Sequence, residues 1–131
     1  MTDISTIEAK DREVELRHPA TDEGLGWIFY LRSPYSEEVR KADRQWQNKR
    51  LAQMGRRKGQ SLTVESLDAA AEAKIEAAMS GWKFEGDATF EGEQPEFSLS
   101  KLREIIRNPK HRWIRDFLDT ELGDYDSFFN S

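Results

Sequence analysis

The chain has 131 residues, a formal net charge of −5, and charged side chains at 34 % of its positions. Its four Trp, seven Phe and three Tyr can supply one sizeable core, which excludes a wholly disordered chain. It has no cysteine, which excludes a disulfide framework, a thiolate zinc site and a cysteine nucleophile.

The first third of the chain predicts a β-hairpin followed by a basic helix. Residues 1–10 are expected to be weakly ordered. Residues 13–17 alternate polar and apolar side chains and residues 27–31 are nearly all apolar, so residues 11–32 are predicted to form an antiparallel hairpin. A serine ahead of Glu37 and Glu38 then predicts a helix start, and the glycines at 55 and 59 predict its end.

The next segment carries the clearest helical pattern in the chain. Residues 61–63 open a predicted second helix, and Gly81 is its expected stop. One apolar stripe recurs at steps of three and four: Val64, Leu67, Ala71, Ile75, Ala78, Met79 and Trp82. Residues 83–96 contain Gly86, Gly92 and Pro95, and are expected to form a mobile loop with a short strand near Thr89-Phe90.

Two further helices are predicted near the C-terminus. Ser98 is the expected cap of the third, with Phe97 and Leu102 placed to form a hydrophobic staple. Leu99, Leu102, Ile105 and Ile106 are expected to point inward. Asn108-Pro109 ends this helix and is expected to start the fourth, which ends at Gly123 and leaves a tail over 124–131.

Together these elements predict an α+β fold that is mainly α-helical, with the N-terminal hairpin packed against about four helices. We expect a single domain over residues 1–131, whose helical part covers 33–123. Trp82 and Trp113 are the leading core candidates.

The sequence offers little reactive chemistry. His18 and His111 lie in different elements, so His18 is interpreted as a turn residue and His111 as a surface residue of a first helical turn. No phosphate-binding glycine loop and no G-x-S-x-G elbow is present. We therefore predict a protein that is not an enzyme, with no catalytic residue, no metal and no cofactor.

Two features suggest binding to another molecule. The basic run from Arg40 to Lys58 can grip phosphates, form a solvated helix face, or steer an acidic protein, although the acidic net charge argues against nucleic acid. The adjacent Phe128 and Phe129 can seal the core, anchor a partner, or join further chain.

The order of these features resembles the tail assembly chaperones of long-tailed, lambda-like phages and prophages. The resemblance covers nearly the whole chain. The features that carry it are, in order, the hairpin segment 14–21 with His18-Pro19-Ala20-Thr21, the helix starting at Pro34-Tyr35, Gly81-Trp82, Phe97-Ser98 ahead of Leu102, the Trp113-Ile114 helix, and the terminal Phe128-Phe129. It implies a protein that binds the long, helical tape measure protein, keeps it soluble, and helps to recruit the tail tube protein.

The resemblance also implies that the protein acts in the cytoplasm of the host and is absent from the finished virion. In many members a ribosomal frameshift makes a longer product that contacts the tail tube protein, and codons for Ser127-Phe128-Phe129 can form such a slippery run. We expect no membrane partner, because no apolar stretch approaches the roughly 20 residues of a span and Met1-Thr2-Asp3-Ile4 lacks signal-peptide features. The sequence is also compatible with a homo-oligomer.

The candidate partner-binding residues are the following: Arg40, Arg44, Trp46, Arg50, Leu51, Met54, Arg56, Arg57, Phe128 and Phe129. The helical phase of Trp46 also favours a place in the core. Two alternatives stay open: a small nucleic-acid-binding regulator that uses the basic helix 40–58, and a structural head–tail connector or tail-completion protein.

Overall fold

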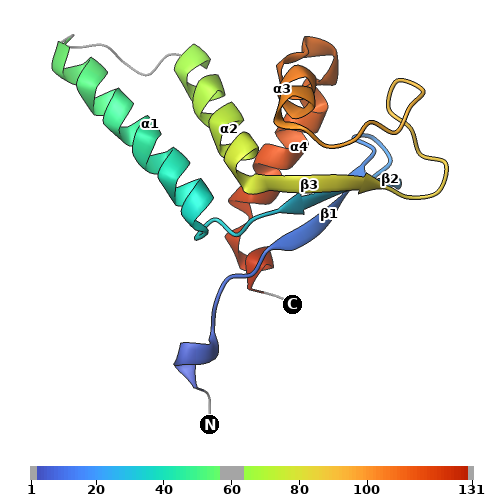
Figure 1. Ribbon diagram of the computed structural model, residues 1–131, viewed down its shortest axis with the longest axis horizontal. Coiled ribbons are helices and arrows are strands. Elements are labelled where there is room, and N and C mark those ends of the chain that lie inside the picture. Colours follow the sequence, from blue (N-terminus) through green and yellow to red (C-terminus); the bar gives the residue numbers. More distant parts are fainter. Residues whose placement is uncertain (1–2, 57–63, 130–131) are drawn as a thin grey trace.

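The computed structural model describes residues 3–56 and 64–129, and within them a three-stranded sheet is combined with four α-helices (Figure 1). The predicted α+β, mainly helical class is confirmed. The strands and α-helices follow in the order β1 (Arg12–Arg17), β2 (Gly24–Leu31), α1 (Glu37–Arg56), α2 (Val64–Ala78), β3 (Met79–Phe84), α3 (Leu99–Arg107) and α4 (Arg112–Gly123). Short 3₁₀ helices lie at Ile4–Thr6, Pro109–His111 and Tyr125–Phe128.

The predicted hairpin is confirmed, and β2 is the central strand of the sheet. β1 and β2 pair antiparallel, with Val14 opposite Phe29, and β3 pairs antiparallel with the other edge of β2. The hairpin turn is held by His18, whose Nδ1 accepts hydrogen bonds from the backbone N–H groups of Ala20 at 3.0 Å and Thr21 at 3.2 Å. This confirms the turn role expected for His18.

The third strand corrects the prediction that the second helix runs on to Gly81. Met79 and Trp82, both buried, continue the apolar step of three residues, so the sequence pattern does not show that the helix ends at Ala78. Instead of stopping a helix, Gly81 lies opposite Tyr30 of β2, where a Cβ would stand 3.3 Å from the Tyr30 ring. The predicted loop therefore begins after Phe84, and the expected strand near Thr89-Phe90 is only an isolated bridge.

A serine cap starts the third helix as predicted, whereas the prediction that the fourth helix starts at Pro109 is wrong. Pro109–His111 form a 3₁₀ helix, and α4 begins at Arg112 without a side-chain cap. The Ser98 side chain accepts a hydrogen bond from the Lys101 backbone N–H at 3.0 Å, and Phe97 and Leu102 flank this cap. Asn108 similarly accepts from the Lys110 N–H, ahead of Pro109. A second prediction here is wrong: Leu99 lies in the first turn of α3 and is 49 % exposed, so it does not point inward.

The Ser98 cap makes a measurable contribution to stability. We expect Ser98→Ala to lower the free energy of unfolding by about 1 kcal/mol, because the Lys101 N–H loses its acceptor. Urea denaturation followed by tryptophan fluorescence measures this. Ser100→Ala, in the same helix and exposed, is the matched control and should change stability by less than about 0.5 kcal/mol. Equal effects of the two substitutions would contradict the role of the cap.

The core lies where α2, α3 and α4 pack on one another and on the sheet. Trp82 is a core residue as predicted, whereas Trp113 is half-buried and packs against the core from its edge. The best-buried side chains come from every layer: Phe29, Leu31, Ile75, Leu102, Leu118 and Leu122.

A ladder of ion pairs joins α2 to α3 and α4. Carboxylates recur every fourth residue on one face of α2, and each meets an arginine of the C-terminal helices. The pairs are Asp68 with Arg112 and Arg115, Glu72 with Arg107, and Glu76 with Arg103. Arg115 is the only buried arginine of these pairs. Solvent therefore screens the attraction between Asp68 and Arg115 less than it screens the other pairs.

The C-terminal tail folds back onto the core. Phe128 is 1 % exposed, its carbonyl accepts a hydrogen bond from the Lys10 backbone N–H at 2.7 Å, and the Arg12 guanidinium lies 5.3 Å from its ring centroid. This confirms the core-sealing interpretation for Phe128, and its burial argues against the predicted role as a partner-binding residue. Phe129, the next residue, is 44 % exposed.

Candidate functional site

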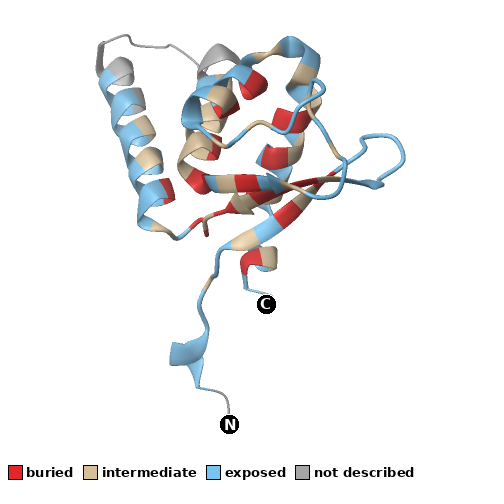
Figure 2. Cartoon of the chain, turned by 45° about the vertical axis from the view of Figure 1, so that its right-hand side comes forward, coloured by how far each residue is buried: buried red, intermediate tan, exposed pale blue. Residues whose placement is uncertain are grey.

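The first candidate surface is α1, which contacts α2 and diverges from it toward its C-terminal end (Figure 1). Among the α1 side chains that the structure describes, only Val39 is buried, while Ala42 and Trp46 are half-buried (Figure 2). These three residues recur at steps of three and four, so they form the inward face of the helix. The other side chains that the structure describes in α1 are exposed and therefore available to another molecule.

Helical geometry separates the residues that the sequence analysis grouped together. At about 100° per residue, Arg40, Arg44 and Leu51 fall within about 40° of one another. They form one outward stripe, which we call the Arg–Leu stripe, and Leu51 is 64 % exposed in it. Trp46 lies about 140° away from Leu51 on the face of Val39. The interpretation of Trp46 as an inward residue is thus favoured over a role in the stripe.

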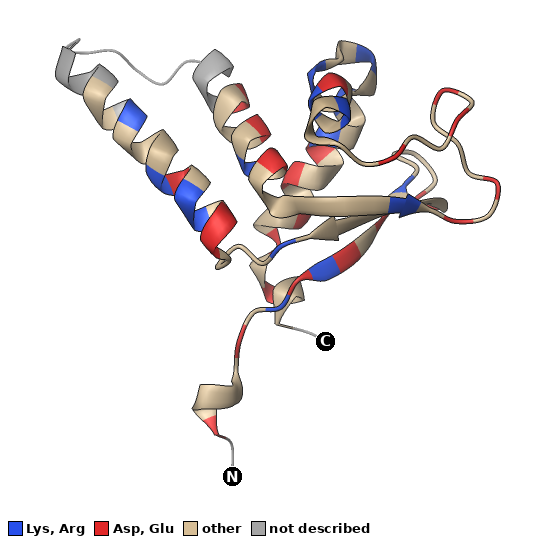
Figure 3. Ribbon diagram, viewed as in Figure 1, with Lys and Arg blue, Asp and Glu red and all other residues tan. Residues whose placement is uncertain are grey.

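Not every predicted residue can be placed. The side chains of Arg50, Met54 and Arg56 fall outside the described part of α1, and Arg57 lies wholly outside the described residues. Of the predicted arginines, Arg44 donates to Glu37 Oε1 at 2.9 Å in an exposed pair, which has little energetic weight. The exposed cations Arg40, Lys41 and Lys49 leave the helix positively charged overall (Figure 3).

An exposed aromatic patch lies at the base of α1. Phe129 packs edge-on to Tyr35 with ring centroids 6.0 Å apart, and Tyr125 contacts Tyr35 at 6.2 Å. All three rings are at least 42 % exposed. The tail therefore places Phe128 in the core and Phe129 at the surface. Phe129 remains a predicted contact residue for a partner.

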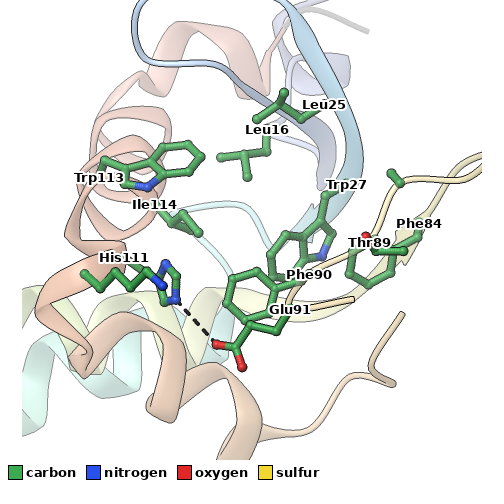
Figure 4. Close-up of a pocket in the computed structure, with 12 residues that line it drawn as sticks. Leu16, Leu25, Trp27, Phe84, Thr89, Phe90, Glu91, His111, Trp113 and Ile114 are labelled. Carbon is green, nitrogen blue, oxygen red and sulfur yellow. Dashed lines mark ion pairs between the residues drawn. The ribbon is translucent and has the colours of Figure 1, made fainter. Parts of the chain in front are cut away.

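The second candidate is a cleft that the sequence analysis missed, with a volume of about 610 Å³ (Figure 4). It lies between the hairpin, the loop that follows β3, and the start of α4. We call it the aromatic cleft. Its lining consists of Leu16, Leu25, Trp27, Phe84, Ala88, Thr89, Phe90, Glu91, Lys110, His111, Trp113 and Ile114. No local pattern could reveal it, since its walls come from four separate segments of the chain.

Trp27 is the centre of the aromatic packing behind this cleft. Its ring stacks on Phe84 at 4.8 Å and lies 5.1 Å from Phe90. Its indole Nε1 is buried and has no hydrogen-bond partner among the described residues. A buried N–H without an acceptor costs free energy, so apolar packing must hold Trp27 in this position.

His111 lies at the edge of the cleft and corrects the expectation of a surface residue. Its ring packs against Phe90 at 4.8 Å, its Nε2 lies 3.5 Å from Glu91 Oε1, and its side chain is 12 % exposed. Glu91 is 58 % exposed, however, so this pair lacks the shielded carboxylate that acid–base catalysis uses. The cleft offers mainly aromatic and aliphatic contact surface.

The described residues offer no arrangement for two other kinds of site, a metal centre and a membrane span. No group of three or more His, Cys, Asp or Glu side chains there is arranged to hold a metal ion. None of the helices described is both long enough and apolar enough to cross a membrane. Comparison with known proteins found no match, whether to a family model, a curated protein or a solved structure.

Proposed function

We propose that the protein is a tail assembly chaperone of a long-tailed phage or prophage, which binds the tape measure protein and helps to recruit the tail tube protein. The proposal places it in the host cytoplasm and outside the mature virion. The resemblance of the sequence suggests this function, and the observation that carries it is the exposure of Leu51 within the basic Arg–Leu stripe of α1.

An apolar side chain edged by arginines on a projecting helix suits a polypeptide partner. Leu51 can enter an apolar stripe on a partner helix, while Arg40 and Arg44 meet acidic residues beside that stripe. Each contact of this size is weak. A long helical partner offers many similar segments, so several copies bound along it keep its apolar surface covered without a tight single site.

The stripe can be tested by coexpression with the tape measure protein encoded in the same genome. We expect the triple variant Arg40→Glu, Arg44→Glu, Leu51→Glu to lower the soluble yield of the tape measure protein at least about fivefold, the loss typical of one important contact. Since the three side chains are exposed, the variant should itself remain folded. Leu99→Glu, at an exposed leucine of α3, is the control and should leave the yield unchanged.

The same variants separate the proposal from nucleic-acid binding. A regulator that grips phosphates through Arg40 and Arg44 would lose salt-sensitive binding to DNA or RNA in a gel shift when these arginines are reversed, and Leu51→Gln alone would have no effect. For the chaperone, Leu51→Gln alone should reduce the soluble yield. If the soluble yield of the tape measure protein is unchanged with the triple variant, the stripe has no role in binding it.

A further inference from the structure

The loop on one side of the aromatic cleft is strongly acidic, and Glu91 of this loop lines the cleft itself. The loop between Phe84 and Phe97 contributes four lining residues to the cleft and contains no lysine or arginine. Figure 3 shows its charge at the opposite end of the molecule from basic α1. Its five exposed carboxylates are Glu85, Asp87, Glu91, Glu93 and Glu96.

Cations of the chain balance only part of this charge. Lys83 lies 3.8 Å from Glu85, Lys110 lines the cleft, and the Lys101 ammonium lies 5.8 Å from the ring centroid of Phe90. The imidazole of His111, which adds positive charge only when protonated, lies 3.5 Å from Glu91. Asp87, Glu93 and Glu96 form no ion pair with any residue that the structure describes. A cluster of like charges beside an apolar cleft repels itself, so positive charge supplied from outside is favourable there.

We propose that the aromatic cleft is a docking site for an amphipathic helix of a partner polypeptide, whose apolar side chains enter the cleft and whose flanking lysines and arginines meet the acidic loop. A volume of about 610 Å³ lies in the usual range for binding sites and can hold more than one bulky side chain. Neighbouring apolar residues three or four positions apart on one helix present such a pair.

The cleft and the Arg–Leu stripe therefore select opposite flanking charges. The stripe favours acidic residues beside an apolar segment, and the cleft favours basic ones. A long partner with both kinds of segment is bound at two sites of one molecule, which raises the overall affinity. The identity of this partner as the tape measure protein rests on the proposed function, whereas the cleft and its charge preference do not.

Two synthetic helical peptides test the cleft. They share one leucine and phenylalanine stripe, with lysines flanking it in the first and glutamates in the second. Fluorescence anisotropy of the labelled peptides on the full chain measures both dissociation constants. We expect the lysine-flanked peptide to bind at least about tenfold more tightly, and its affinity to fall with added salt. Equal affinities, or no binding of either peptide, would overturn the proposal.

Matched variants locate the binding. Leu25 lines the cleft at 36 % exposure, and Leu25→Gln should weaken the lysine-flanked peptide about fivefold, whereas Leu99→Gln outside the cleft should not. The charge variant is Asp87→Asn, Glu93→Gln, Glu96→Gln, which should reduce the preference for lysine about threefold or more. Its control neutralises three exposed carboxylates elsewhere: Glu8→Gln, Glu13→Gln, Asp119→Asn. The site would be contradicted if the two leucine variants weakened the peptide equally, or if the two charge variants reduced the preference for lysine equally.

The experiments distinguish a failure of the proposed chaperone function from a failure of the proposed docking site in the aromatic cleft. The α1 triple variant should lose the tape measure protein yet still bind the lysine-flanked peptide. If the peptide does not bind while the wild-type chain still keeps the tape measure protein soluble, only the cleft proposal is wrong. If the peptide binds and the tape measure protein is not kept soluble, only the proposed function is wrong.

Discussion

Phe128→Ala is expected to lower the free energy of unfolding by about 3–5 kcal/mol, the largest single effect that we predict. Phe128 is 1 % exposed and belongs to the core cluster, although it lies only three residues before the last residue of the sequence. Its removal leaves a cavity and also strips the Arg12 guanidinium of the ring on which it packs. Urea denaturation followed by tryptophan fluorescence measures the loss.

The neighbouring Phe129 is a control of the same residue type. It is 44 % exposed and contacts Tyr35 at the surface, so Phe129→Ala should cost less than about 1 kcal/mol. A difference of less than about 1 kcal/mol between the two substitutions would show that the tail does not seal the core. The pair also separates stability from binding, because only Phe129 is accessible to a partner.

Asp68→Asn is expected to destabilise the protein by about 2–3 kcal/mol. Asp68 Oδ1 accepts from Arg115 Nη2 at 2.8 Å, and the Arg115 side chain is only 8 % exposed. Removing the charge leaves the buried guanidinium with only the exposed carboxylate of Asp116, 3.6 Å from Arg115 Nη1, as its counter-ion. Loss of the only partner typically costs about 3–5 kcal/mol for a fully buried pair. We expect less here, because the Asp68 side chain is 32 % exposed and water can partly replace it.

Glu76→Gln is the matched substitution at the other end of the same ladder. Its partner Arg103 is 47 % exposed, so the loss should stay within about 1 kcal/mol. The double variant Asp68→Asn, Arg115→Met should recover at least about 1 kcal/mol relative to Asp68→Asn alone, because it removes the buried charge that has lost its closer counter-ion. Thermal and urea denaturation of the four proteins measure these differences. Equal losses for Asp68→Asn and Glu76→Gln would show that burial of Arg115 does not govern the ladder.

The local signals in the sequence predicted much of the secondary structure correctly. Alternation over 13–17 and the apolar run over 27–31 predicted the hairpin, since half-buried strands show a period of two. Ser98 and Asn108-Pro109 placed the start of α3 and the boundary before α4 because caps act through bonds within a few residues. The binding residues on α1 were predicted as a set, without their division into two faces.

What only the tertiary structure decided depends on contacts between distant residues. β3 exists because β2 pairs with it, although Met79 and Trp82 fit a helical stripe equally well. Phe128 and Phe129 are the same residue type with opposite burial, since the Lys10 and Arg12 segment covers only the first of them. The aromatic cleft has the same origin: local propensity sets each element, but the meeting of four separate segments creates the surface that we expect to bind a partner.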